Sequence, residues 1–373
     1  MTVSLSALGM VCALGGANGE IIRRALAGDS GGMSEWHGVL PEGAASPFGM
    51  APLADDFAAR FDCRCQALLA ACAEQLRTPL DALKSRYPAE RIGVALGTSN
   101  STMEEFTQNR SRIDMSIPAR FLRRWCGLSG PALTVSTACS SSAKVFATAR
   151  RLIATGVCDA VLVGGVDSYT RLVFCGFNSL EALSHAACDP LGVERGGINL
   201  GEGAAVFVME RDGGDVALLG VGESSDAYHL TAPKPDGSGA VAAMRSALAD
   251  AGLEPAAVGY VNLHGTGTVY NDRMESAAVY EVFGAGPYCS STKPMTGHTL
   301  GAAGAIEVGL CWLMLKSDGR LLPHLNRSPV DPQLPPLRLA RIGDVCRVDA
   351  AISNSFAFGG SNASVIIGRP RCG

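Results

Sequence analysis

The sequence predicts an α/β protein made of two successive α/β halves. Strand-like apolar runs alternate with helical runs along the 373 residues, an order typical of sheets covered by helices. A polar break at 211–214, Arg-Asp-Gly-Gly, separates two such series, so we place the halves at residues 1–212 and 213–373. Hydrophobic residues make up 47% of the chain and charged residues only 18%. A large buried core is therefore expected.

The first half is expected to begin with a strand and a loop within residues 1–16, since this segment lacks the basic start of a signal peptide. Further short apolar runs predict strands, and runs with helical spacing predict helices. The strands are Ile92–Leu96, Leu133–Thr137, Ala160–Gly164 and Ala204–Met209, and the helices are Ala67–Leu76, Ala119–Cys126 and Ser141–Ile153.

The second half repeats the alternation, and each half is expected to be largely parallel. Whether the two halves share a structural repeat does not follow from residue identity. The strands are Val216–Val221, Val258–Leu263, Tyr288–Ser291, Ala350–Ser353 and Ala363–Ile367, and the helices are Gly239–Ala251, Asp272–Val282 and Ala302–Leu315.

Cys139 lies where a predicted strand passes into a predicted helix. The strand at 132–137 is short, β-branched and bounded by Gly130-Pro131, so we expect it to be buried. From Ser140 onward the apolar residues recur at helical spacing until Gly156, a natural helix end. A thiol at the start of a helix faces unpaired N–H groups and the positive end of the dipole, which favour the thiolate. Cys139 is therefore a candidate nucleophile.

The other cysteines and the overall charge point to ordinary roles. The thirteen cysteines are scattered, without the paired spacing of a zinc site, and most are expected to be small buried residues in a reducing cytoplasm. The net charge of -4 gives no reason to expect nucleic-acid binding. No apolar run reaches the roughly 18 residues that a membrane span needs.

Four glycine-rich loops follow predicted strands, where ligands bind in open α/β sheets. They are Thr137–Ser142, His264–Asp272, Lys293–Gly304 and Asn354–Asn362. Because they come from both halves, a composite site is expected at the junction.

Two of the six histidines have a setting that favours function. His264 directly follows a predicted strand and opens the sequence HGTGTVYND, and His298 lies within KPMTGHTLGAAGAIE between Lys293 and Glu307. A histidine at the end of a strand beside small residues is poorly explained as core filling. The remaining four, His37, His185, His229 and His324, have no such setting and are expected to be structural or surface residues.

With Cys139, His264, His298 and the sequence NSFAFGGSN at 354–362, the chain resembles a β-ketoacyl-[acyl-carrier-protein] synthase of the elongating Cys-His-His type, in the thiolase superfamily. The resemblance covers nearly the whole chain, including GLSGPALTVSTACSSSAK, LVGGVDS and NLGEGAAVFVMER. It implies a five-layered αβαβα fold and a dimer. It also implies that Cys139 accepts an acyl chain from acyl-carrier protein, and that the carbanion left when malonyl-carrier loses CO2 attacks this thioester.

The residue types suit this chemistry. A thiolate attacks thioesters well and divides one hard condensation into two steps. Decarboxylation leaves an enolate oxygen that needs hydrogen-bond donors, a role that two neutral imidazoles, His264 and His298, can fill. We expect Lys293 to hold His298 in position and to bias the site electrostatically, and Glu307 to be a supporting partner.

The resemblance assigns further residues. The backbone N–H groups of Cys139 and Phe358 would hold the oxyanion of acyl transfer, and Phe358 matches a gating aromatic. Thr266 and Thr268 match positions that bind the phosphopantetheine arm, on which the substrates travel, so neither a separate cofactor nor a metal is expected. Lys144, one helical turn after the cysteine, is expected to be structural.

Recognition of an acidic carrier protein by a slightly acidic enzyme requires a local basic patch. Two clusters resemble the docking region of the family, Arg60 with Arg64 and Arg110 with Arg112. One departure weakens this prediction, because Asp189 stands where a basic contact is usual. This departure and the short N-terminus leave the pathway open between fatty-acid and polyketide or polyene synthesis.

Several alternatives remain. A non-catalytic, chain-length-determining partner subunit would lack the active cysteine. A thiolase would need a second cysteine in a late Cys-x-Gly context, which Cys346 and Cys372 do not offer, and a Cys-His-Asn synthase would lack His298. A Cys-His hydrolase does not account for two histidines and Lys293. A homodimer and a heterodimer with a related subunit are both compatible with the sequence.

Overall fold

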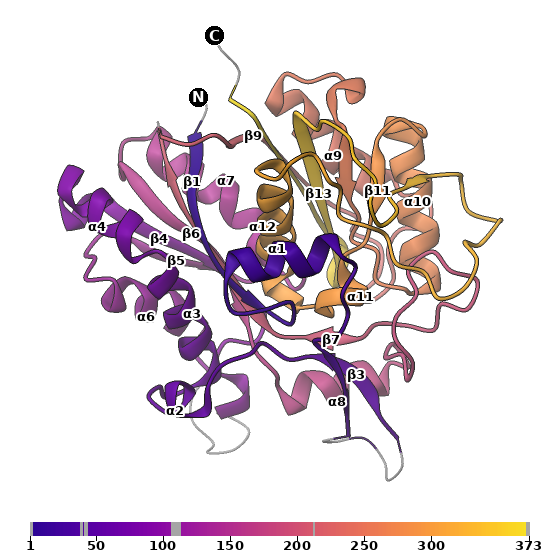
Figure 1. Ribbon diagram of the computed structural model, residues 1–373, viewed down its shortest axis with the longest axis horizontal. Helices are drawn as coiled ribbons and strands as arrows, with labels where there is room; N and C mark the ends of the chain where they lie inside the picture. Colours follow the sequence, from indigo (N-terminus) through magenta and orange to yellow (C-terminus); the bar gives the residue numbers. More distant parts are fainter. Residues whose placement is uncertain (1–2, 38–39, 41–43, 106–112, 212, 371–373) are drawn as a thin grey trace.

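The computed structural model describes residues 3–37, 40, 44–105, 113–211 and 213–370. Its strands, as Figure 1 labels them, lie as follows. They are β1 (Val3–Cys12), β2 (Met33–Trp36), β3 (Ser46–Gly49), β4 (Ile92–Gly97), β5 (Ala132–Val135), β6 (Ala160–Asp167), β7 (Leu200–Gly201), β8 (Gly203–Glu210), β9 (Ala217–Ser225), β10 (Tyr260–Asn262), β11 (Tyr288–Ser290), β12 (Arg338–Leu339), β13 (Ala350–Ala357) and β14 (Ser361–Gly368).

The helices alternate with these strands for most of the chain. They are α1 (Asn18–Leu26), α2 (Asp55–Ala58), α3 (Arg64–Gln75), α4 (Arg77–Arg86), α6 (Ile117–Trp125), α7 (Ser141–Ala154), α8 (Arg171–Ser179), α9 (Ser238–Ala251), α10 (Val269–Phe283), α11 (Lys293–Thr296) and α12 (Ala303–Leu315), with short 3₁₀ helices η1 (Ala89–Arg91), η2 (Pro255–Ala257), η3 (Leu300–Ala302) and η4 (Phe358–Gly360). Among the described residues, no helix has the length and apolar character to cross a membrane.

The described strands form two similar groups. Their order in the large sheet is β12-β11-β10-β13-β14-β9-β1-β8-β6-β4-β5, and a small sheet contains β2, β3 and β7. The groups meet where β1 and β9 pair antiparallel over two residue pairs, Val3 with Leu218 and Ser4 with Ala217. One group runs from β1 outward to β5, the strand that precedes Cys139. The other runs from β9 outward to β11 and β12.

The prediction of largely parallel halves is wrong for the central strands. Next to β1 and β9 the pairings β1/β8, β8/β6, β9/β14 and β14/β13 are antiparallel, whereas β6/β4, β4/β5, β13/β10 and β10/β11 are parallel. Only the three residues Phe358–Gly360 join β13 to β14. A connection that short makes a hairpin, because a parallel pair needs a long crossover.

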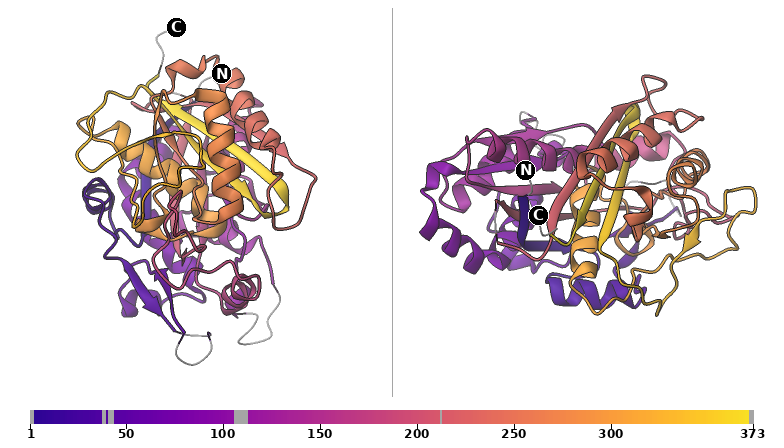
Figure 2. Two further views of the ribbon diagram at one scale, coloured as in Figure 1. Left: turned by 90° about the vertical axis from the view of Figure 1, so that its right-hand side faces the viewer. Right: turned by 90° about the horizontal axis from the view of Figure 1, so that it is seen from above.

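The five-layered αβαβα fold is confirmed. Helices α7 and α12 lie in the middle and contact strands of both groups, while α3 and α6 cover the outer face of one group and α9 and α10 flank the other. In Figure 2, right, the purple N-terminal and the orange-to-yellow C-terminal elements form two blocks side by side.

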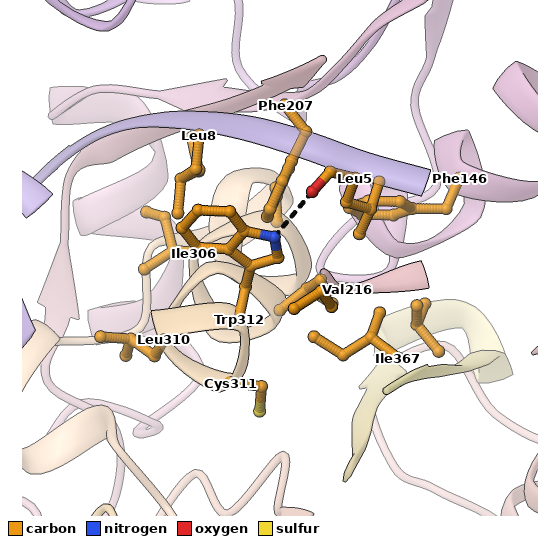
Figure 3. Close-up of a cluster of buried hydrophobic side chains, with 14 of the residues drawn as sticks. Leu5, Leu8, Phe146, Phe207, Val216, Ile306, Leu310, Cys311, Trp312 and Ile367 are labelled. Carbon is orange, nitrogen blue, oxygen red and sulfur yellow. Dashed lines mark hydrogen bonds between the residues drawn. The ribbon is translucent and has the colours of Figure 1, made fainter. Parts of the chain in front are cut away.

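Trp312 on α12 joins the two blocks in the core (Figure 3). Its indole Nε1–H donates a 2.8 Å hydrogen bond to the carbonyl oxygen of Leu5 on β1. Its ring meets Phe207 of β8 edge to face, with centroids 6.5 Å apart, and Val216 and Ile367 belong to the same buried cluster. The partnered N–H allows a large polar-tipped side chain to be buried between the halves.

The strand before Cys139 is an edge strand, which corrects the prediction that it is buried. β5 pairs with β4 on one side and ends the sheet on the other, and the Leu133 side chain is 40% exposed. A β-branched run predicts a strand but does not say whether a second neighbour covers it.

Candidate active site

Cys139 lies on a strained turn between β5 and α7. The preceding residue, Ala138, has a φ of 52°, a left-handed conformation that costs a non-glycine residue on the order of 1 kcal/mol. Short hydrogen bonds hold the turn, because the Ser141 hydroxyl donates to the Ala138 carbonyl at 2.5 Å and accepts the Thr137 N–H at 2.9 Å. The sequence prediction of a strand-to-helix elbow is confirmed.

Gly97 allows α7 to begin directly against β4. A Cβ atom at this position would lie 2.3 Å from the backbone nitrogen of Ser142, so any side chain there would push the start of the helix away. The placement of the nucleophile therefore depends on a glycine in a different strand.

The backbone of His264 is fixed by Glu275 on α10. One carboxylate oxygen accepts the His264 N–H and the other accepts the Gly265 N–H, both at 2.7 Å. On the same helix, Asp272 accepts the N–H groups of Leu191 and Gly267. These two acids bind the loop after β10 on one side, so the histidine cannot move without breaking buried hydrogen bonds.

Sequence reasoning missed the roles of Asp272 and Glu275. Burial raises the pKa of Glu275 to about 7 and that of Asp272 to about 6, against ordinary values near 4. A signal was present, since two acids follow HGTGT within the predicted helix Asp272–Val282. Buried carboxylates need partners, and glycine-rich loops supply N–H groups.

His298 is held by the segment NLGEG at 199–203. Its N–H donates to the Asn199 carbonyl at 2.7 Å, and its own carbonyl accepts the Gly201 N–H at 3.1 Å. Gly297, which precedes it, has a φ of 69° and passes so close to Leu200 that a Cβ atom would lie 2.4 Å from the Leu200 oxygen. The segment NLGEG therefore positions the loop that carries His298.

The structure brings Cys139, His264 and His298 together. The Nε2 atom of His298 lies 3.0 Å from the Sγ atom of Cys139, and the two imidazole rings are nearly perpendicular with centroids 5.3 Å apart. All three side chains are buried. The grouping matches the composite site expected from loops of both halves.

Both imidazoles are neutral at physiological pH. Burial, followed by the nearby Lys293 charge, lowers the pKa of His264 and of His298 well below the ordinary value. Neither Nδ1 atom has a hydrogen-bond partner among the described residues. A proton on Nδ1 would be a buried donor without an acceptor, so the proton belongs on Nε2. Each ring then offers an Nε2–H donor.

Cys139 does not match the thiolate prediction. Burial raises its pKa to about 12, although Lys293 opposes this effect. Burial of the sulfur therefore raises the pKa by more than the positive end of the helix lowers it, and Cys139 is a thiol at neutral pH. It must lose its proton during the reaction.

Lys293 forms its ion pair with Glu307 rather than a hydrogen bond with His298, which corrects the expectation that it holds the histidine in position. Both side chains are buried, and the Lys293 Nζ atom donates to Glu307 Oε1. The lysine acts on the two histidines and the cysteine through its charge, as the pKa shifts show.

A cavity of about 660 Å³ contains Cys139, His264 and His298 in its wall and extends to the surface. Thr266 and Thr268 also line it, with their hydroxyl oxygens 3.0 Å apart. Residues of the loop at 228–235 and of α8 complete the wall, although sequence analysis did not single them out.

Phe358 lines the same cavity and is not a core residue. It is partly exposed and stacks on Phe177 of α8, with ring centroids 5.6 Å apart. The loop that it occupies is shorter than predicted, because β13 continues to Ala357.

The predicted docking cations have other roles or lie outside the described residues. Arg64 pairs with Glu202, which is fully buried, at 2.5 Å, so this arginine is structural. Arg60 is exposed and lies over the rings of Phe57 and Phe61. Arg110 and Arg112 lie outside the described residues.

Asp189 is not a surface carboxylate, contrary to the expectation. It is buried and accepts hydrogen bonds from Asn326, from the Arg327 N–H at 2.8 Å and from the N–H and hydroxyl of Ser328. Lys144 lies 3.8 Å from Glu223 in a surface ion pair, as expected of a structural lysine.

Two other histidines have defined settings. His324 is buried, accepts the Ser291 N–H through Nδ1 at 3.0 Å, and places Nε2 3.0 Å from the Pro190 carbonyl. His229 lies at the cavity wall, although sequence analysis gave it no role there. No cluster of potential metal ligands occurs among the residues that the structure describes.

A buried thiol beside two neutral imidazole donors, in a cavity that extends to the surface, defines an acyl-transfer site in a thiolase-like fold. Family models agree: residues 27–213 match "Beta-ketoacyl synthase, N-terminal domain" and residues 216–327 match "Beta-ketoacyl synthase, C-terminal domain". The chain belongs to the β-ketoacyl synthase family of the thiolase superfamily, and it is therefore an acyltransferase-type enzyme.

Individual relatives give the same family. The chain is 36% identical over 257 residues to a 3-oxoacyl-[acyl-carrier-protein] synthase 2 of Synechocystis, a match that covers 64% of this chain and 62% of that protein. It is 34% identical over 315 residues to the Coxiella burnetii protein of the same name, covering 75% and 76% of the two chains.

Solved structures are similar over nearly the full length. A chain from the complex of a ketosynthase (ApeO) with its chain length factor (ApeC) from Xenorhabdus doucetiae is 40% identical, with a TM-score of 0.90 and coverage of 99% of this chain and 98% of that chain. A β-ketoacyl synthase from Burkholderia phymatum is 29% identical, with a TM-score of 0.86 and coverage of 99% and 100%.

Proposed function

We propose that this enzyme condenses an acyl thioester formed on Cys139 with malonyl-acyl-carrier protein, releasing 3-oxoacyl-carrier protein, CO2 and free carrier protein. The observation that supports this reaction best is the 3.0 Å separation between His298 Nε2 and Cys139 Sγ, with the His264 ring beside them in one cavity. Two neutral donors next to a nucleophile suit a reaction with both a thioester and an enolate.

In the first step the sulfur of Cys139 attacks the acyl thioester, the bond from the acyl carbon to the carrier sulfur breaks, and the cysteine proton passes to the departing carrier thiolate. The Nε2–H of His298 donates to the sulfur as negative charge develops on it. The backbone N–H groups of Cys139 and Phe358 hold the oxyanion.

In the second step the malonyl group loses CO2, and the electron pair of the broken bond forms an enolate. The Nε2–H groups of His264 and His298 stabilise its oxygen. The enolate carbon then bonds to the acyl carbon on Cys139, and the cysteine leaves as a thiolate that takes a proton from solvent. Burial, together with the charge of Lys293, keeps both imidazoles neutral.

Other residues guide the substrate. The hydroxyl groups of Thr266 and Thr268 bind the phosphopantetheine arm along the cavity wall, and Phe358 acts as a gate, because Gly359 and Gly360 on its C-terminal side both have positive φ. The substrates bring their own thioester carrier, so the reaction needs no separate cofactor. A cytoplasmic location stays a prediction.

We also propose that the enzyme works as a dimer through the β5 edge, with a related synthase-like subunit as the favoured partner. The edge is half-exposed and carries an exposed leucine, and two structural neighbours are titled as ketosynthases with chain length factors. Because Cys139 and both histidines are in place, this chain is the catalytic subunit, and the pathway is fatty-acid, polyketide or polyene elongation.

Intact-protein mass spectrometry with acyl-carrier thioesters tests the function. The wild type and a Cys126→Ala control should gain one acyl group per chain, and Cys139→Ala none. His264→Ala should retain acylation but lose condensation by about 10² or more, the scale of losing an oxyanion donor. His298→Ala should lose both, since this ring also contacts the sulfur. Acylation of Cys139→Ala at another cysteine would contradict the proposal.

A further inference from the structure

Exposed apolar side chains gather at the mouth of the catalytic cavity. Leu180, Tyr228, Val269 and Tyr270 line this cavity, and the last is 72% exposed. Leu230, 76% exposed, lies in the same loop as Tyr228. These five residues, which we term the mouth rim, come from the end of α8, the loop after β9 and the first turn of α10. A group of exposed apolar residues at one opening marks an interaction surface rather than random scatter.

The described charges in the cavity wall give an acidic partner no net attraction. The charged residues in the cavity wall, histidines aside, are Glu181, which is exposed, and Arg195, which is buried and paired with Asp331. In the loop of Leu230, the Lys234 ammonium is bonded to Ser238 and paired with Asp236.

The exposed Arg273 follows Tyr270 by a turn of α10, and the exposed Glu181 offsets its charge. The predicted basic cluster is also reduced, because Arg64 is committed to Glu202. The charges that the structure describes at this opening therefore supply no net positive patch for an acidic carrier protein.

The rim is also held in place before any partner binds. The carbonyl of Leu230 accepts the Gly359 N–H at 2.7 Å, which ties the rim to the loop of Phe358. Asp226 accepts the Lys234 N–H and the Asn362 side-chain amide, which closes the base of the loop. An apolar surface on a fixed backbone binds with little loss of conformational entropy.

We infer that the mouth rim docks the carrier protein through an apolar face around its pantetheine attachment site, and that apolar contact rather than ion pairing gives the affinity. The inference rests on the proposed function, because a protein-bound thioester that reaches Cys139 through this cavity must bring its carrier against the rim. Glu181 then works against binding of an acidic carrier, and its removal should strengthen docking.

Steady-state kinetics with acyl-carrier protein and with a small acyl-pantetheine thioester test the inference. Leu230→Ser and Tyr270→Ser should each raise the KM for acyl-carrier protein about tenfold, the scale of losing one buried apolar side chain. The increase should exceed any change with the small thioester by at least about fivefold. Matched controls are Tyr280→Ser, further along α10, and Ile342→Ser, both exposed and outside the cavity wall, which should leave both substrates unaffected.

Salt dependence and Glu181→Gln give independent readouts. Raising the salt from about 50 to about 500 mM should leave the wild-type KM for the carrier nearly unchanged, because Arg273 and Glu181 offset each other and screening then removes no net attraction. Glu181→Gln should lower that KM at low salt.

A carrier KM that rises steeply with salt and is unchanged in Leu230→Ser would overturn the apolar mode of docking while leaving the proposed function intact. A change in the oligomeric state of Leu230→Ser, measured by sedimentation, would assign the rim to a subunit interface and also overturn it. Failure of the small thioester to acylate wild-type Cys139 would instead overturn the proposed function, and this inference with it.

Discussion

Lys293 biases the protonation of the catalytic residues through its charge rather than through a hydrogen bond. Burial has the largest effect on the pKa values of Cys139, His264 and His298, and the charge of Lys293 lowers all three, while its own ammonium is paired with Glu307. A buried cation with a paired acid can thus bias three groups at once, because electrostatic effects in a dry site extend beyond contact distance.

Replacing Lys293 with Met should raise the pKa of all three groups. The thiolate fraction of Cys139 falls about tenfold for each unit that its pKa rises, so its alkylation by iodoacetamide at pH 8 should slow, as followed by peptide mapping. The variant should also lose about 3–5 kcal/mol of stability, because Glu307 is left buried and unpaired.

The double variant Lys293→Met with Glu307→Leu separates the two effects. Stability should largely return, since no buried charge remains, while the alkylation of Cys139 should stay slow. Recovery of the alkylation rate together with stability would show that Lys293 acts through folding alone.

At the scale of elements, each catalytic loop is fixed by a different segment of the chain. α10 supplies Glu275 to the loop of His264, and the segment around Asn199 supplies the carbonyl that positions His298. α3 has a related role, because Arg64 at its first position bonds the buried Glu202 and the Ala51 carbonyl. The helix is therefore anchored to the strand turn before β8 by a charge pair.

Arg64→Gln should destabilise the protein by about 3 kcal/mol, because it leaves the Glu202 carboxylate buried without a counter-ion. Thermal unfolding should show a clear decrease in Tm, whereas Arg60→Gln, a change at an exposed arginine, should leave it within error. At temperatures where both variants are folded, the KM for acyl-carrier protein should be similar to wild type. A large KM increase in Arg64→Gln with unchanged Tm would restore this residue to the docking surface.

At the scale of the whole molecule, His324 links segments of the second half to the loop that precedes the catalytic motif NLGEG. Its ring bonds the Ser291 N–H after β11 and the Pro190 carbonyl, and its backbone N–H donates to Ala340. Burial lowers its pKa to about 4. The ring is neutral in the folded protein, and protonation at Nδ1 would remove the acceptor of the Ser291 N–H.

Stability should fall as the pH decreases from about 6.5 to about 4. Because the folded-state pKa of His324, about 4, is below the unfolded value of about 6.5, the unfolded chain takes up the proton first. The contribution is fully present above pH 6.5 and amounts to roughly 2–4 kcal/mol.

Chemical denaturation of wild type and His324→Gln over this pH range measures that contribution. The wild type should lose more stability than the variant, because only the wild type has this titration. Asp272 and Glu275 titrate with the opposite sign, since burial raises their pKa, but they are common to both proteins and cancel. Parallel pH curves for the two proteins would contradict the assignment.

The sequence by itself determined the alternation of elements, the elbow at Cys139 and the four loops that meet at the site. Each of these depends on local features: the period of apolar residues, a glycine or a β-branched run beside the residue in question. The identities of Cys139, His264 and His298 followed from motifs, which are also contiguous. These features can be predicted from the sequence because neighbouring residues create them.

Only the tertiary structure decided the partners and the protonation of these residues. Lys293 bonds Glu307 rather than His298, Arg64 bonds Glu202 rather than a carrier protein, and Asp189 turns inward to the loop at 326–328. The thiol of Cys139 is protonated because layers from both halves exclude water from it. Burial and pairing are properties of segments that are distant in sequence and meet only in the fold, so no local pattern reports them.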